Sequence, residues 1–112
     1  MKAVALAICV TVGLLSTVPV WAATMPELAK KNRCDDCHAI DKKIIGPAWM
    51  DVSKKYQGDA GAEARLVQKV SKGGSGVWGD MPMPANDPGG RKQEDIKGLV
   101  QFILGLAKGL GN

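Results

Sequence analysis

Two cysteines and a histidine occur within five consecutive residues, Cys34, Cys37 and His38, in the order C-x-x-C-H. This pentapeptide is the attachment signature of a c-type haem. Two thiols at this spacing can reach the two vinyl groups on one edge of a porphyrin, and the imidazole that follows lies under the iron. The motif therefore predicts one covalently bound haem c with its iron, held by two thioethers and by His38 as the proximal ligand.

The first 22 residues have the pattern of a secretory signal peptide, a leader that is removed on export. Lys2 provides a positive start, residues 3–15 are almost wholly apolar, and residues 20–22 form a cleavage site. The apolar run is too short and wrongly flanked for a stable membrane span. We expect cleavage after Ala22, with Ala23 as the second candidate, and export across the inner membrane to the periplasm.

The C-x-x-C pair admits two other interpretations. An exported chain would also be able to oxidise Cys34 and Cys37 to a disulfide, as in a haemless redox protein. Thioredoxin-like sites lie in a βαβ pattern, and no alternating strand pattern occurs here. Zinc usually needs four protein ligands, and residues 23–112 contain one histidine and two cysteines. The position of His38 directly after Cys37 favours haem.

Residues 23–112 are enough for one domain and carry 14 basic and 11 acidic side chains, a net charge of +3. A net charge this small does not indicate a nucleic-acid-binding protein. The charge either keeps the surface solvated or steers an acidic partner toward a redox edge. Only four aromatic side chains remain after the leader, so the core is thin. A domain of this size needs additional stabilisation, which a buried, tethered porphyrin would supply.

Helical periodicity predicts an all-α chain with four helices. They cover residues 25–33, 49–56, 59–72 and 92–108. The last is the clearest, because its apolar residues follow the i, i+3, i+4, i+7 spacing of a core-facing stripe. That stripe begins Ile96, Leu99, Val100, Ile103. Asp59 is the expected N-cap of the third helix.

Residues 73–90 form a long loop with six glycines and three prolines. Loops of this length are uncommon in compact domains and usually carry function. Proteins with a single haem c commonly take a thioether sulfur as the second axial ligand. Two prolines bracket Met83, which would stiffen the loop and aim its sulfur. Met83 is therefore the predicted second ligand of the iron, with Met81 as the alternative.

Three further residues are candidates for supporting roles. The backbone carbonyl of Pro47 is a suitable acceptor for the second ring nitrogen of His38. Asn86 either donates its amide to the sulfur of Met83 or is an ordinary turn residue. The indole N–H of Trp78 needs a partner when it is buried, and this would be a haem propionate unless Trp78 only packs.

These features together resemble the small class I bacterial cytochromes of the c-551/c-552 type. The matching segments are residues 28–32, 34–38, 46–48, 76–79 and 82–84. The resemblance implies the class I cytochrome c fold, in which about four helices wrap around one covalently bound haem. It implies the same roles for His38, Met83, Pro47, Asn86 and Trp78. Lys69, Met81, Ala85 and Phe102 depart from the usual pattern of such proteins.

The first functional hypothesis is a periplasmic monohaem electron carrier between respiratory donors and a terminal reductase or oxidase. We expect a monomer that redox partner proteins dock against transiently at the haem edge, with no membrane span after leader removal. A six-coordinate iron leaves no open position for a substrate, so the chain is expected not to be an enzyme. The alternative is a haem enzyme or gas sensor with a displaceable sixth ligand, although a second histidine for acid–base work is missing.

Overall fold

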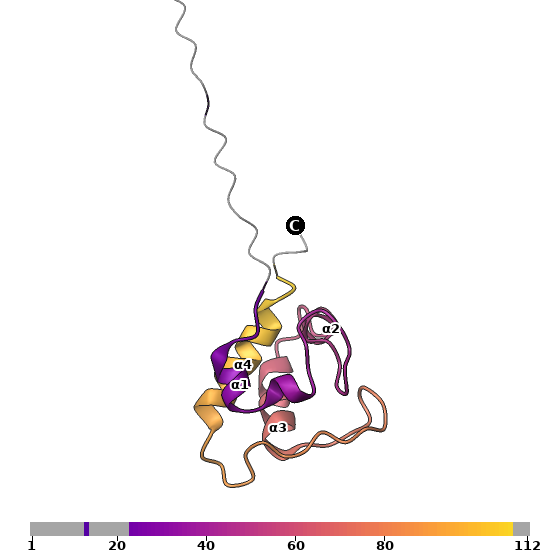
Figure 1. Ribbon diagram of the computed structural model, residues 1–112, viewed down its shortest axis with the longest axis vertical. Coiled ribbons are helices and arrows are strands. Elements are labelled where there is room, and N and C mark those ends of the chain that lie inside the picture. The colour runs from indigo at the N-terminus through magenta and orange to yellow at the C-terminus, as the bar shows by residue number, and fades with distance from the viewer. Residues whose placement is uncertain (1–12, 14–22, 109–112) are drawn as a thin grey trace, which may run out of the picture.

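The computed structural model describes Gly13 and residues 23–108, and its regular elements are helices joined by loops (Figure 1). Its elements are α1 (Glu27–Lys31), the 3-10 helix η1 (Cys34–Asp36), α2 (Trp49–Lys55), α3 (Ala62–Lys72) and α4 (Gln93–Gly105). The described residues contain two isolated bridges and no strand, which confirms the all-α class with four α-helices. The expected leader lies outside the described residues, apart from Gly13.

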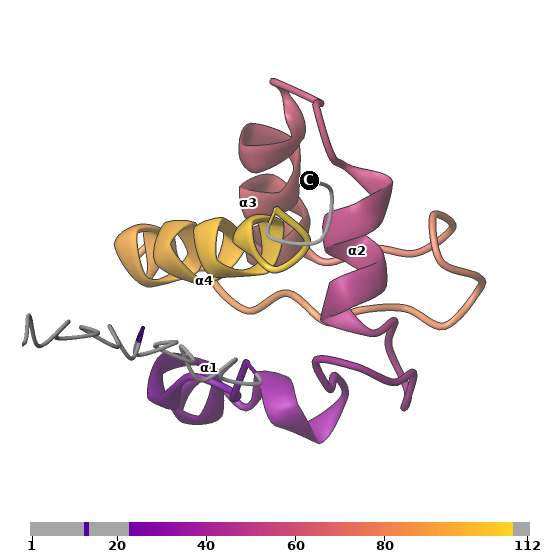
Figure 2. The same ribbon diagram turned by 90° about the horizontal axis from the view of Figure 1, so that it is seen from above.

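Helix α4 is the centre of the fold. It contacts α1, α2 and α3, and in Figure 2 it lies between α1 on one side and α3 on the other. The expected apolar stripe of α4 is confirmed, because Ile96, Leu99, Val100 and Ile103 are all buried. Trp49 and other apolar residues of α1 and α2 pack against this stripe. The core thus joins both halves of the chain around one helix.

The third helix begins later than the sequence predicts. Asp59 is not its N-cap; α3 begins at Ala62, after Gly61. The Asp59 carboxylate accepts the backbone N–H of Gly61 at 3.0 Å and pairs with Arg65. Asx side chains often stabilise such turns in place of a helical cap. Asp59 therefore closes the turn ahead of α3.

A buried carboxylate, Asp87, fixes the entry into α4. Its two oxygens accept the backbone N–H groups of Arg91 at 2.8 Å and Lys92 at 2.9 Å. The side-chain amide of Gln93 donates to the same carboxylate and to the hydroxyl of Ser71 on α3. Burial raises the pKa of Asp87, but the hydrogen bonds from Gln93, Lys92 and Arg91 outweigh it and leave the pKa below its ordinary value. The carboxylate therefore joins α3 to α4.

A second buried polar contact joins α2 to the end of α4. The hydroxyl of Ser53, which is fully buried, donates to the carbonyl of Leu104 and accepts the N–H of Ala107. It satisfies backbone groups that the helix end leaves unpaired.

Within Gly13 and residues 23–108, no helix has the length and apolar character needed to cross a bilayer.

Candidate haem-binding site

One open hollow contains every residue that the sequence assigned to the site. It has a volume of about 1360 Å³, including the part open to solvent. Residues of α2, α3, α4 and the 73–90 loop contribute to its walls. The predicted residues on its walls are Cys34, Cys37, His38, Pro47, Trp78, Met83 and Asn86. Met81, the alternative ligand, also lines it.

The mouth of the hollow exposes large apolar side chains. Ile45, Val77, Trp78 and Met81 all line it, yet between 40% and 67% of each is exposed. Contiguous exposed apolar surface of this kind marks a binding site. A flat, largely apolar group such as a porphyrin would cover the parts of these side chains that face the hollow. Two thiols, an imidazole and a thioether on the same walls are also the donor set that haem c requires.

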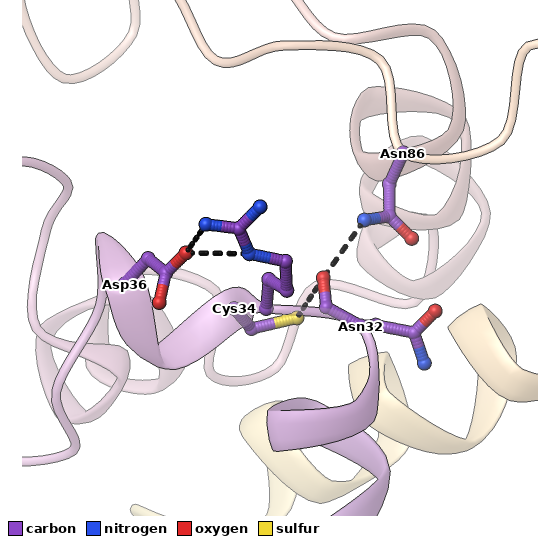
Figure 3. A network of polar contacts seen from close by, with 5 residues as sticks. Asn32, Cys34, Asp36 and Asn86 are labelled. Carbon is purple, nitrogen blue, oxygen red and sulfur yellow. Dashed lines mark hydrogen bonds and ion pairs between the residues drawn. The ribbon is translucent and has the colours of Figure 1, made fainter.

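The attachment segment turns sharply after α1. Arg33 adopts a left-handed conformation with φ of 58°, which is uncommon for a residue with a side chain. Its guanidinium pairs with the carboxylate of Asp36 at 2.7 Å, a contact that Figure 3 marks with dashed lines at Asp36. The N–H groups of Cys37 and His38 then both donate to the carbonyl of Cys34, at 3.2 and 2.9 Å. This turn brings the two free, half-buried thiols and the imidazole together.

The environment of Cys34 bears on the haemless alternative. Burial raises the pKa of its thiol above the ordinary value, and the negative charge of Asp35 adds to the effect. Thiols of redox-active C-x-x-C sites are activated by a lowered pKa. The surroundings of Cys34 therefore do not match those of a C-x-x-C redox site.

The ring of His38 is held on three sides. Its Nδ1 lies 2.8 Å from the carbonyl oxygen of Pro47, the acceptor expected from the sequence. Its face lies against Gly46, where a β-carbon would be 2.4 Å from Cε1. The ring of Trp49 is 5.9 Å away, centroid to centroid. With Nδ1 as the donor to Pro47, Nε2 is left as the nitrogen that can bind a metal.

Met83 is held by its backbone at the end of α3. Its N–H donates to the carbonyl of Gly74 and its carbonyl accepts the N–H of Gly74, both at 2.9 Å. Gly73, with φ of 74°, packs under this bridge, since a β-carbon there would be 2.4 Å from the carbonyl oxygen of Met83. Met83 is half-buried, whereas 67% of Met81 is exposed. The backbone thus anchors Met83 more firmly than Met81.

Asn86 has a partner that the sequence analysis did not name. Its side-chain N–H donates to the backbone carbonyl of Asn32 at 3.2 Å, and not to a methionine sulfur (Figure 3). The thiol of Cys34 lies 4.0 Å from the same carbonyl. This acceptor is available because Asn32 ends α1 and its carbonyl is not used within the helix. The Oδ1 of Asn86 is buried without a partner among the described residues, so a second donor would be accommodated there.

The sequence analysis gave no separate role to Asn32. Only 7% of it is exposed, and its side chain donates to the carbonyl of Leu28 at 2.9 Å, which closes the last turn of α1. Its own carbonyl joins the attachment segment to the 73–90 loop through Asn86. The signals in the sequence were its place two residues before the first cysteine and its position at the end of the matching segment 28–32.

Trp78 lies at the rim of the hollow. It is 40% exposed, and the ammonium of Lys55 lies 5.7 Å from its ring centroid. No described side chain accepts a hydrogen bond from its indole N–H. The geometry therefore leaves that N–H available to a group bound in the hollow.

Comparisons with known proteins agree with this site. The cytochrome c family profile matches residues 23–107. The chain is 46% identical to cytochrome c-551 of Pseudomonas aeruginosa over 104 residues, which cover 93% of this chain and 97% of that one. It is 52% identical to cytochrome c-551 of Allochromatium vinosum over 79 residues, which cover 70% and 82%.

The fold is also similar to a solved structure. The crystal structure of cytochrome c552 from Nitrosomonas europaea matches with a TM-score of 0.67 at 42% identity, covering 71% of this chain and 96% of that chain. The resemblance inferred from the motifs is confirmed by these matches. The chain therefore belongs to the cytochrome c family, as a small class I cytochrome of the c-551/c-552 type with one covalently attached haem c and its iron.

Proposed function

We propose that this cytochrome carries single electrons in the periplasm, from respiratory donors to a terminal reductase or oxidase, and that it is not an enzyme. One observation carries the proposal: Cys34, Cys37, His38 and Met83 line the same apolar hollow. When bound, the haem supplies a reversible change between Fe(III) and Fe(II). Relatives named cytochrome c-551 and c-552 support this class of function.

The residues divide the work between attachment, ligation and orientation. Cys34 and Cys37 would form the two thioethers, which prevent loss of the haem. His38 and Met83 would ligate the iron, and a thioether ligand would raise the reduction potential. The carbonyl of Pro47 holds the imidazole ring in one orientation. Ligation by His38 and Met83 together would leave the iron no position for a substrate.

Redox partners would dock briefly at the open rim. Val77, Trp78 and Met81 present exposed apolar surface there, next to the ammonium of Lys55. Small interfaces with an apolar centre suit complexes that form and separate quickly. We propose a monomer in solution, with partners exchanged one at a time.

The ligand assignment has a direct test in a matched pair of variants. The oxidised protein should show a methionine-to-iron charge-transfer band near the red end of the spectrum. Met83→Ala should abolish this band and lower the reduction potential. Met81→Ala should keep the band and the reduction potential of the unmodified protein. The reverse pattern would assign the ligand to Met81. High-spin iron or rapid carbon monoxide binding in the unmodified protein would favour the haem enzyme or gas sensor.

The location is tested separately on protein from a periplasmic extract. Cleavage of the leader after Ala22 should give a mature chain that begins at Ala23, as measured by intact mass. A pyridine haemochrome assay on the same sample should give one haem per chain. A colourless product from a host with cytochrome maturation proteins would contradict the proposal.

A further inference from the structure

The tip of the 73–90 loop has few attachments to the rest of the molecule. Residues 74–82 are all exposed. Within the described chain, their backbone hydrogen bonds are those of the Gly74–Met83 bridge at the base and one from Gly76 to Gly79, at 2.8 Å, inside the turn. Figures 1 and 2 show this loop extending away from the helices. Among the described residues, side chains therefore provide the remaining contacts between this loop tip and the helices.

One charged side chain reaches this loop from the body. Lys55 is the last residue of α2, and its ammonium lies 5.7 Å from the ring centroid of Trp78 and 5.8 Å from that of Tyr56. Cations within about 6 Å of an aromatic centroid are attracted by the ring quadrupole. The ammonium thus links the tip of the loop to the helix beside it.

Both rings also belong to the hollow. Trp78 and Tyr56 line it, whereas Lys55 is exposed and outside its walls. The four ion pairs of the described residues do not include Lys55, so no carboxylate competes with the rings for its charge there. The lysine is therefore placed to hold Trp78 at the mouth while leaving the interior free.

We infer that Lys55 is a positioning residue that holds the loop tip closed over the haem edge through Trp78. The inference rests on the proposed function, because it concerns exposure of the haem edge to water. A covered edge favours the ferrous state, which carries less charge, and so raises the potential. Lys55 thereby contributes to the potential without touching the haem.

Amide hydrogen exchange on the holoprotein tests the contact. In Lys55→Gln, the N–H of Gly76 should exchange about two- to fivefold faster, the factor expected for loss of one exposed cation–π contact. The N–H of Asn86, which is bound to the carbonyl of Val70 at 3.0 Å, should not change. Lys55→Arg keeps a cation over the rings and should restore slow exchange at Gly76.

The neighbouring lysine provides a matched control. Lys54 is also exposed in α2, and its ammonium lies over no described aromatic ring. Lys54→Gln removes the same charge, so it should leave exchange at Gly76 unchanged and lower the potential less than Lys55→Gln does. Unchanged exchange in Lys55→Gln, or equal effects of the two variants, would overturn the inference.

Haem content separates this result from the proposed function. The pyridine haemochrome assay is made on every sample before exchange is measured. Absence of haem would overturn the proposed function itself. Full haem content with normal exchange in Lys55→Gln would overturn only the role of Lys55.

Discussion

The imidazole of His38 lies directly against Gly46, so closely that a β-carbon at position 46 would be 2.4 Å from the ring carbon Cε1. The next residue, Pro47, accepts a hydrogen bond from the same ring at 2.8 Å. The N–H of Gly46 in turn donates to the carbonyl of Cys37 at 2.8 Å. This glycine–proline pair therefore sets both the space and the orientation of the imidazole.

Gly46→Ala should displace the ring of His38 and lower haem loading. We expect a loss of about 1–3 kcal/mol in the free energy of unfolding, as for other overpacked sites. Haem per chain and thermal unfolding would measure the two effects. Gly105→Ala is the control, because a β-carbon there meets nothing within 4 Å. Full loading and unchanged stability in Gly46→Ala would show that the ring has room to move.

Gly73→Ala should shift the segment that carries Met83. A β-carbon at position 73 would be 2.4 Å from the carbonyl oxygen of Met83 and 2.8 Å from the nitrogen of Ala85. Gly76 also has a positive φ, but a β-carbon there meets nothing. Both variants should lose about 1–2 kcal/mol from left-handed backbone strain. Only Gly73→Ala should weaken the charge-transfer band, and an equal effect in Gly76→Ala would point to strain alone.

Asp87→Asn should destabilise the fold at neutral pH, with an effect that shrinks in acid. The pKa of Asp87 is lowered in the folded state, so its stabilisation is complete above the unfolded pKa of about 3.9 and is lost as pH falls through the lower folded value. Denaturant unfolding would be measured from about pH 2 to about pH 7, a range that includes the unfolded pKa. The difference in the free energy of unfolding between Asp87→Asn and the unmodified protein should become smaller below about pH 4.

Asp80→Asn is the matched control for this experiment. Asp80 is exposed in the loop, and the four ion pairs of the described residues do not involve it. Its replacement should leave the stability curve unchanged. A gap for Asp87→Asn that stayed constant down to pH 2 would mean that the lost amide contacts, and not the charge, account for the effect.

Ser53→Ala should lower stability without changing the haem site. The change removes the buried hydroxyl that donates to the carbonyl of Leu104 and accepts the N–H of Ala107. Unpaired buried groups of this kind cost about 1–3 kcal/mol. Thermal unfolding and potentiometry on one sample would measure both quantities. Ser75→Ala, on the exposed loop, should change neither, and a shifted potential in Ser53→Ala would contradict a purely structural role.

Predictions from the sequence pattern were confirmed where the structure depends on residues close together in the chain. The apolar stripe from Ile96 to Ile103 gave the central helix, because a 3.6-residue period needs no knowledge of the partner. The predicted start of α3 was wrong. An aspartate at this position can either cap a helix or stabilise a turn, and the contacts of Asp59 with Gly61 and Arg65 stabilise the turn. The 3-10 turn at the cysteines also escaped prediction, since it depends on the left-handed Arg33.

The chemistry of this cytochrome follows from the order of its residues. Cys34, Cys37 and His38 are close in the chain, so their joint reach to one porphyrin is a local property, and the cofactor could be inferred without coordinates. The place of Met83 and the partner of Asn86 are not local. They depend on the bridge to Gly74 and on the carbonyl of Asn32. The contact of Asn86 with Asn32 joins residues 54 positions apart in the chain, and the bridge of Met83 to Gly74 joins the two ends of the loop tip; neither pairing is visible in a local pattern.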